Sequence, residues 1–156
     1  MIYLLLFCVL IIAELIYFRI ADRFNIIDKP NERSSHKSIT LRGGGIIFLF
    51  GAWLYAAFFG LQYPWFLTGL SLVAIISFID DIHSLPDSIR LVVQFIAMFL
   101  MFQQFGILNW ESWWIILIAL IVCVGVSNAY NFMDGINGIT GGYSLALMLP
   151  LVFINA

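Results

Sequence analysis

Residues 114–142, WIILIALIVCVGVSNAYNFMDGINGITGG, change midway from an apolar run to a polar one. The thirteen residues 114–126 are typical of the middle of a membrane-spanning helix. Three asparagines, one aspartate and four glycines then follow within residues 128–142. Because amide and carboxylate side chains are costly inside a bilayer, this pattern predicts that a helix leaves the membrane near residue 128 and that a binding surface begins there.

The composition of the whole chain favours a membrane protein. Of its 156 residues, 63% are hydrophobic and 10% are charged, and the mean hydropathy is +1.03. Such a chain has too little polar surface to cover a water-soluble globule. The net charge of −2 comes from a few short segments and indicates no nucleic-acid partner. Cys8 and Cys123 lie in apolar runs without metal-ligand spacing, so we expect them to pack rather than to react.

The lengths of the uncharged runs predict the number of membrane crossings. A hydrocarbon core of about 30 Å requires roughly 20 helical residues. On this basis we expect one all-α domain over residues 1–156, a transmembrane helical bundle with five complete spans and part of a sixth. The five spans cover residues 2–18, two short helices between Arg42 and Asp80, residues 91–110 and residues 112–133. The last fourteen residues would form about 21 Å of helix. We therefore expect the chain to be the amino-terminal part of a longer protein.

The basic residues predict the orientation of the bundle. Short cytoplasmic loops retain Lys and Arg, and all seven basic residues fall in two places. Six follow the first span and the seventh is Arg90. Cytoplasmic loops are therefore expected at about residues 20–44, 80–90 and 132–142, which places three polar clusters on one face of the membrane.

The first cluster is IIDKPNERSSHKSITLRGGG, residues 26–45. It combines cationic and hydroxyl side chains with three glycines, whose backbone N–H groups can approach a ligand closely. Such a loop could bind phosphate. The alternative is a loop that only fixes topology, and composition alone favours that alternative. The candidate substrate-binding residues are Arg33, His36, Thr40, Arg42 and Gly44.

The second cluster is FIDDIHSLPDSIRLVVQ, residues 78–94. Adjacent Asp80 and Asp81 at the mouth of a membrane helix repel one another unless a cation or hydrogen-bond donors offset the cost. We assign them a functional role; the alternative is that both face water and that Asp81 caps the turn. Asp87 and Arg90, three residues apart, predict a surface ion pair worth about 0.5 kcal/mol or less.

The third cluster begins where the quoted helix ends. Asn128, Asn131, Asp134 and Asn137 recur every three residues, so on a helix they would line one wall with oxygen atoms. Hard cations such as Mg²⁺ prefer oxygen ligands and bind through one or two carboxylates plus substrate phosphates. The amides would remain free to bind a nucleotide. The alternative is a polar helix end followed by turn residues.

Three motifs in this order resemble a known family. They are D-x-P-N-x-R-S-S-H-x-x-x-T-x-R-G-G-G at 28–45, the acidic pair Asp80-Asp81, and N-A-x-N-x-x-D-G-x-N-G at 128–138. The chain resembles the polyprenyl-phosphate N-acetylhexosamine-1-phosphate transferases, glycosyltransferase family 4. The resemblance implies transfer of a sugar-1-phosphate from a UDP-N-acetylhexosamine to undecaprenyl phosphate, with release of UMP. The cofactor would be Mg²⁺, with Mn²⁺ as an alternative, and the location the cytoplasmic face of the bacterial inner membrane. The first motif is closer to the branch that begins O-antigen and other surface polysaccharides.

The same resemblance implies roles for individual residues. Catalytic roles fall on Asp80, Asp81 and Asp134, and metal binding on Asp81, Asn131 and Asp134. Asn128, Asn131 and Asn137 would bind substrate, although many bacterial members have aspartate where Asn137 stands. The later acidic motif and the histidine-rich loop of the family are absent before Ala156, so catalysis is not expected of a chain that ends there. Homodimerisation is left open.

Two alternatives of another class follow from the sequence. One is a non-catalytic remnant or scaffold of the family. The other is a cation-coupled transporter, suggested by Glu14 within the first span. Transport sites tend to lie near the bilayer midplane, whereas the polar clusters here are expected at one surface. We therefore expect Glu14 to face another helix.

Overall fold

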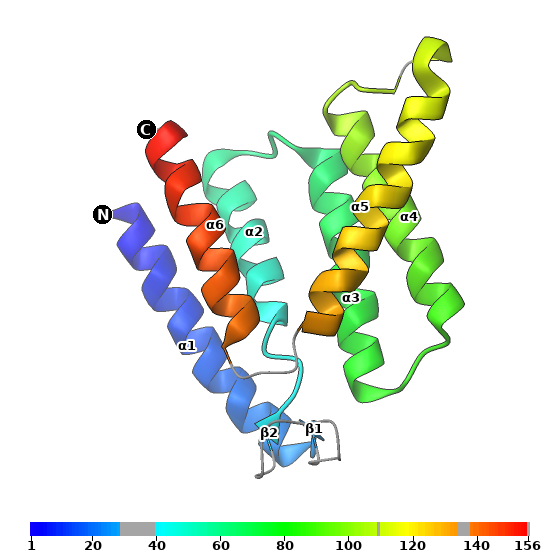
Figure 1. Ribbon diagram of the computed structural model, residues 1–156. Helices are drawn as coiled ribbons and strands as arrows, with labels where there is room; N and C mark the ends of the chain where they lie inside the picture. The colour runs from blue at the N-terminus through cyan, green and yellow to red at the C-terminus, as the bar shows by residue number, and fades with distance from the viewer. Residues whose placement is uncertain (29–39, 109, 134–137, 156) are drawn as a thin grey trace.

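The computed structural model describes residues 1–28, 40–108, 110–133 and 138–155. Its described residues form a helical bundle, which confirms the predicted all-α class (Figure 1). The helices are α1 (Ile2–Arg23), α2 (Ile46–Phe59), α3 (Pro64–Ile82), α4 (Asp87–Gln104), α5 (Trp113–Met133) and α6 (Ile139–Asn155). A short 3₁₀ turn, η1 (Trp110–Ser112), precedes α5.

Each helix packs against its neighbour in the chain, and the α3–α4 pair makes the most extensive contact. A close approach explains this. A Cβ atom on Gly69 of α3 would lie 2.9 Å from the carbonyl oxygen of Ala97 on α4, so only glycine permits the two backbones to come this near. Small residues at helix crossings are typical of membrane bundles. Leu67, Phe102 and Ala97 are each 6% exposed and form the apolar part of this core.

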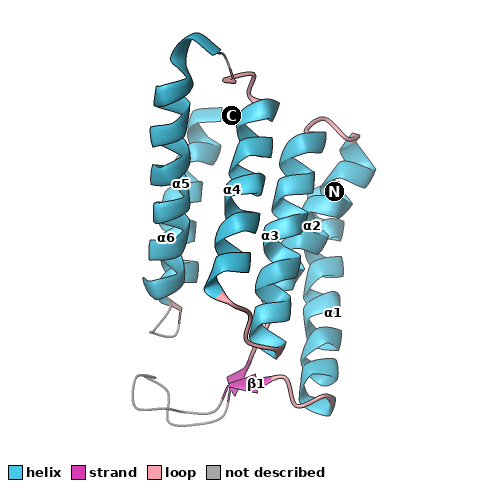
Figure 2. Ribbon diagram, turned by 90° about the vertical axis from the view of Figure 1, so that its right-hand side faces the viewer, coloured by secondary structure: helices cyan, strands magenta, loops and turns pink. Residues whose placement is uncertain are grey.

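Three pairs of helix ends lie at one end of the bundle. Figures 1 and 2 show there the end of α1 with the beginning of α2, the α3–α4 turn, and the end of α5 with the beginning of α6. The α2–α3 and α4–α5 links lie at the opposite end. The alternation predicted from the sequence therefore brings the acidic pair, the glycine-rich segment and the end of α5 to one end of the molecule.

Among the residues that the structure describes, three helices, α1, α3 and α5, are long and apolar enough to cross a membrane. The predicted count of five complete spans is matched only roughly. Helix α2 has 14 residues, about 21 Å of helix against a core of about 30 Å, because it begins only at Ile46 and ends before Gly60, whose φ is +87°. Helix α4 has 18 residues and carries Asp87 and Arg90 in its first turn.

The helices extend further than the predicted loop boundaries allowed. Helix α1 continues to Arg23, α3 contains both Asp80 and Asp81, and α4 begins at Asp87. A helix satisfies its own backbone hydrogen bonds, so it can continue beyond the apolar core that its sequence marks. The link between α3 and α4 is consequently a tight turn.

A small antiparallel sheet, which the sequence did not predict, follows α1. It pairs β1 (Ile27–Asp28) with β2 (Thr40–Leu41), so that Ile27 faces Leu41 and Asp28 faces Thr40. The N–H of Arg42 extends the pairing by donating to the carbonyl of Ile26 at 3.0 Å. Strands of two residues leave no periodic signal. The sheet brings the residues just after α1 next to those just before the glycine-rich segment, and β2 contacts α1.

Candidate functional site

The acidic pair lies in the last turn of α3, and its two members face different neighbours. Consecutive residues on an α-helix are separated by about 100° around the axis. Asp80 faces α4, where it contacts Arg90. Asp81 instead lines a pocket beside the segment that leads into α2. Adjacent carboxylates are thereby directed to two separate surroundings.

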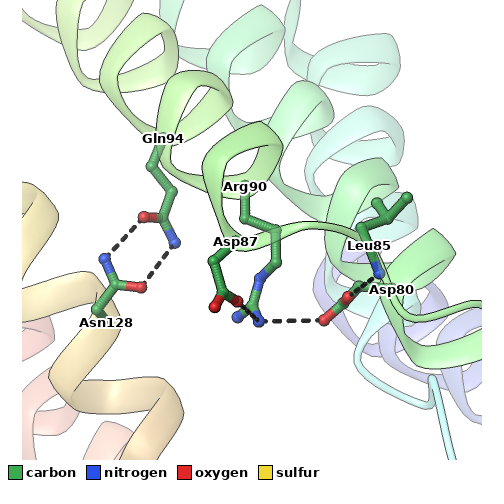
Figure 3. A network of polar contacts seen from close by, with 6 residues as sticks. All are labelled: Asp80, Leu85, Asp87, Arg90, Gln94 and Asn128. Carbon is green, nitrogen blue, oxygen red and sulfur yellow. Dashed lines mark hydrogen bonds and ion pairs between the residues drawn. The ribbon is translucent and has the colours of Figure 1, made fainter.

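Asp80 joins the ends of α3 and α4. Its Oδ2 lies 3.2 Å from Nη1 of Arg90, and both side chains are 23% exposed. Its Oδ1 accepts a hydrogen bond of 2.8 Å from the N–H of Leu85 in the turn (Figure 3). One alternative from the sequence has Asp81 cap this turn; the structure shows Asp80 accepting a hydrogen bond from it. Asp80 therefore fixes both the turn and the guanidinium.

The predicted pair between Asp87 and Arg90 is present but secondary. Nη1 of Arg90 lies 3.9 Å from Oδ1 of Asp87, whose side chain is fully exposed. Exposed pairs at this spacing contribute little stability. The shorter contact with Asp80 spans the turn, so the i, i+3 rule could not predict it.

The glycine-rich segment is held between α1 and α3. The hydroxyl of Tyr17 on α1 donates to the carbonyl of Arg42. The next residue, Gly43, has a φ of +76°, and a Cβ there would meet the Tyr17 hydroxyl and lie 2.8 Å from the ring of Phe78. Both the backbone conformation and the space thus require glycine.

A small pocket joins this segment to the acidic pair. It has a volume of about 180 Å³, and its lining includes Gly43, Gly45, Ser77 and Asp81. The structure therefore brings part of the first predicted cluster next to the second. Gly44 does not appear in that lining; it lies against α1, where an added methyl group would be 3.1 Å from Oε1 of Glu14.

Glu14 faces the segment leading into α2. Its Oε2 is enclosed and has no hydrogen-bond partner among the residues that the structure describes. The sequence predicts that Glu14 faces another helix; the structure places Gly44, in the segment that leads into α2, beside its Oε1.

A larger pocket, which we call the α4–α5 pocket, lies between the first turns of α4 and the last turns of α5. Its volume is about 390 Å³. The lining consists of Asp87, Ser88, Arg90 and Leu91 from α4 and Asn128, Asn131 and Phe132 from α5. Two of the predicted substrate-binding asparagines therefore share a pocket with a cation. Guanidinium and amide groups are hydrogen-bond donors that suit phosphate and ribose oxygens.

Two amides link α4 and α5 beside this pocket. Nδ2 of Asn128 donates to Oε1 of Gln94 at 2.8 Å, and Nε2 of Gln94 donates to Oδ1 of Asn128 at 3.4 Å (Figure 3). Asn128 also donates to the carbonyl of Val124 at 3.0 Å. The sequence analysis did not predict a role for Gln94. The feature that could have indicated one is an amide side chain inside an otherwise apolar run.

Several predicted site residues lie outside the described residues or are described in part. Arg33, His36, Asp134 and Asn137 are outside them, and for Thr40 the structure describes only the backbone in β2. Within the described ranges, no three His, Cys, Asp or Glu side chains group closely enough to hold a metal ion. Two of the predicted ligands, Asp81 and Asn131, line different pockets. The third predicted ligand, Asp134, lies outside the described residues, so the magnesium site stays a prediction.

The donors in the α4–α5 pocket fit a metal only in company with an anion. Asn131 and Asp87 offer oxygen atoms, whereas Arg90 in the same wall repels a bare divalent cation. Phosphate groups would reverse this balance, since Mg²⁺ commonly binds through one or two protein carboxylates together with substrate phosphates.

Comparison with known proteins identifies relatives along most of the chain. The model of glycosyl transferase family 4 matches residues 63–156. A probable undecaprenyl-phosphate N-acetylglucosaminyl 1-phosphate transferase of Bacillus subtilis (strain 168) is 24% identical over 156 residues, covering 90% of this chain and 43% of the relative. An undecaprenyl-phosphate alpha-N-acetylglucosaminyl 1-phosphate transferase of Escherichia coli (strain K12) is 30% identical over 145 residues, covering 81% of this chain and 38% of the relative.

A similar protein of Yersinia pestis, also an undecaprenyl-phosphate alpha-N-acetylglucosaminyl 1-phosphate transferase, is 26% identical over 141 residues. The chain spans about two fifths of the length of these curated relatives. No solved structure matches it significantly. The family model covers more than half of the chain, including α3, the acidic pair, α4 and α5 with its asparagines. The chain therefore belongs to glycosyl transferase family 4.

Proposed function

We propose that the protein containing this chain transfers N-acetylhexosamine-1-phosphate from a UDP-sugar to undecaprenyl phosphate, releases UMP, and so begins a cell-surface glycan. The reaction would take place at the cytoplasmic face of the bacterial inner membrane. The observation that carries the proposal is the α4–α5 pocket, in which Arg90, Asn128 and Asn131 meet beside Asp80. The names of the relatives support the class of acceptor and sugar.

The charges of the pocket suit the donor substrate. A UDP-sugar presents a diphosphate, and its transfer depends on positioning and charge neutralisation more than on covalent work by the protein. Arg90 would contact phosphate oxygens, and Asn131 would contact the nucleoside or the phosphates. Mg²⁺, or Mn²⁺ as the alternative, would neutralise the diphosphate when bound, and Asp81, Asn131 and Asp134 are the residues proposed to hold it.

The acceptor phosphate would be the nucleophile. With a second pKa of about 6, a phosphate monoester is mostly dianionic at neutral pH and needs little help from a base. One of its oxygens would form the new bond to the β-phosphorus of the UDP-sugar, while the bond between that phosphorus and the bridging oxygen breaks and UMP departs. Asp80 or Asp81 would position the acceptor. A covalent aspartyl-phosphate intermediate is the competing route.

The test uses the protein as its gene encodes it, including any sequence after Ala156, in membrane vesicles. We expect UMP release from UDP-N-acetylglucosamine or UDP-N-acetylgalactosamine only when undecaprenyl phosphate is present. Chelation with EDTA should stop the release, and Mg²⁺ should restore it. Asp81→Asn should abolish UMP release, whereas Glu111→Gln, which changes an exposed carboxylate in η1 that lines neither pocket, should leave it near the wild-type rate.

Two results would contradict the proposal. One is the absence of UMP release by the wild-type protein with every UDP-N-acetylhexosamine supplied. The other is an Asp81→Asn variant that turns over at the wild-type rate.

A further inference from the structure

Gln94 is a buried polar residue on α4, where that helix packs against α5. It is 8% exposed and lies on α4 in the run DSIRLVVQFIAMFLMFQQ. Burying an amide without hydrogen bonds costs free energy, so an apolar residue would be the simpler choice for helix packing alone. Its partner, Asn128 on α5, bonds to it in both directions at 2.8 and 3.4 Å.

The position of this pair relates it to the α4–α5 pocket. On α4, Gln94 lies four residues, or about one helical turn, after Arg90. On α5, Asn128 lies three residues before Asn131, on the same side of the helix. Asn128, Asn131 and Arg90 all line the pocket, whereas Gln94 does not. The amide pair thus crosses between the two walls at their inner end.

The hydrogen-bonding capacity of Asn128 is largely used within the protein. Its Nδ2 donates to both Gln94 and the carbonyl of Val124, and its Oδ1 accepts from Gln94. An amide nitrogen has only two hydrogens to donate, so no donor remains for a ligand while these contacts persist. Asn131, one turn further, has the better position for substrate.

We propose that Gln94 is a positioning residue, which binds Asn128 and thereby sets the rotation and height of α5 against α4. Its effect is to hold Asn131 and Arg90 at the separation that the nucleotide-sugar diphosphate requires. The identity of the substrate in this inference rests on the proposed transferase function. The positioning of α5 by Gln94 rests on the α4–α5 geometry alone.

The first arm of the test measures the pocket without activity. Cys8 and Cys123 are replaced by Ala, and cysteines are introduced at Ser88 and Phe132, which line opposite walls. Bifunctional thiol reagents of increasing length are then applied to the protein in its membrane. We expect the parent to be linked preferentially by one length, and the Gln94→Met variant, which lacks amide donors and acceptors at similar size, to be linked by a broad range.

The second arm measures kinetics in the full-length protein. Gln94→Met should raise KM for the UDP-sugar by about 3- to 20-fold, the range that corresponds to one or two interhelical hydrogen bonds in a membrane, while kcat changes less. Gln94→Leu serves if Gln94→Met does not accumulate.

Ser71→Ala is the matched control. It removes an interhelical hydrogen bond, from Nε1 of Trp53 to Oγ of Ser71 at 3.1 Å, that lies between α2 and α3 and away from the pocket. We expect it to lower the unfolding temperature without changing KM or the cross-linking pattern.

The outcomes separate the two proposals. An unchanged cross-linking pattern in Gln94→Met overturns the positioning role, whether or not the protein is active. An active wild type whose KM is unaffected by Gln94→Met, or affected equally by Ser71→Ala, also overturns it. A wild type without UMP release overturns the transferase function, and the cross-linking arm then still decides the geometric claim.

Discussion

Arg90 and Asp80 form an ion pair across the α3–α4 turn, with Nη1 3.2 Å from Oδ2, although they belong to different helices. The pair directs the guanidinium toward the end of α3 while it also lines the α4–α5 pocket. One side chain therefore connects the acidic pair with the asparagines of α5, two motifs that are separated by more than forty residues in the sequence.

Replacing Arg90 by Met should weaken the α3–α4 turn. The pair is about one quarter exposed, so its loss should cost about 0.5–1 kcal/mol of unfolding free energy, at the upper end of the range for surface pairs. The measurement is thermal or denaturant unfolding of the purified protein in detergent. Asp87→Asn, at a longer 3.9 Å contact, should cost less; an equal or greater loss would contradict the ranking of the two contacts.

Two substitutions at Asp80 should separate its two contacts. Asp80→Asn removes the charge that pairs with Arg90 but keeps an oxygen that can accept from the N–H of Leu85. Asp80→Ala removes both and leaves that N–H without its partner, for an additional loss of about 1 kcal/mol. Unfolding curves of the two variants would show the difference. Equal stability of Asp80→Asn and Asp80→Ala would mean that the Leu85 contact is not important for the turn.

Substitution of Gly69 should separate α3 from α4. A Cβ atom at this position would lie 2.9 Å from a backbone oxygen of Ala97, which cannot move aside as a flexible side chain would. We expect Gly69→Ala to destabilise the bundle by about 1–3 kcal/mol. Gly125→Ala on α5 is the control, because, apart from the backbone of its own helix and its chain neighbours, no atom of the described residues lies within 4 Å of its Cβ position. It should be neutral or stabilising by up to about 1 kcal/mol, the helix preference of Ala over Gly.

A second glycine comparison tests the segment leading into α2. Gly43→Ala would place a Cβ against Tyr17 and Phe78 and force a non-glycine residue to adopt a φ of +76°. The strain should cost about 1–3 kcal/mol. Gly45→Ala has open space around its Cβ and a φ of −59°, so it should be tolerated. Limited proteolysis near residue 43 would report the loosening. A Gly43→Ala variant as resistant as Gly45→Ala would contradict the close packing of this segment.

Much of the architecture could be predicted because the membrane imposes simple rules. The apolar runs gave the helices, and the spacing of charged residues placed three polar clusters at one end of the bundle. The predicted helix lengths were less accurate, as the length of α2 and the ends of α1 and α3 show. Charged residues in the sequence mark the edge of the hydrocarbon layer. A helix ends where its backbone hydrogen bonding ends, and the two positions differ by several residues.

The details of the site depended on contacts between distant residues. Asp80 and Asp81 were selected together from their sequence, but their directions depend on which neighbour each meets around the helix. Gln94 and Asn128 are 34 residues apart, and a single sequence holds no record of their pairing. The sheet between β1 and β2 is too short to leave a pattern.

The packing of each helix against the preceding one in the chain has a consequence for biosynthesis. Because each helix contacts the one made just before it, a newly inserted segment finds its docking partner already in the bilayer. Contacts between nearby parts of a chain require little loop closure and form quickly. The α3–α4 hairpin, with its tight turn and its glycine crossing, can therefore be complete before α5 leaves the ribosome, and Gln94 would then be the template on which Asn128 is placed.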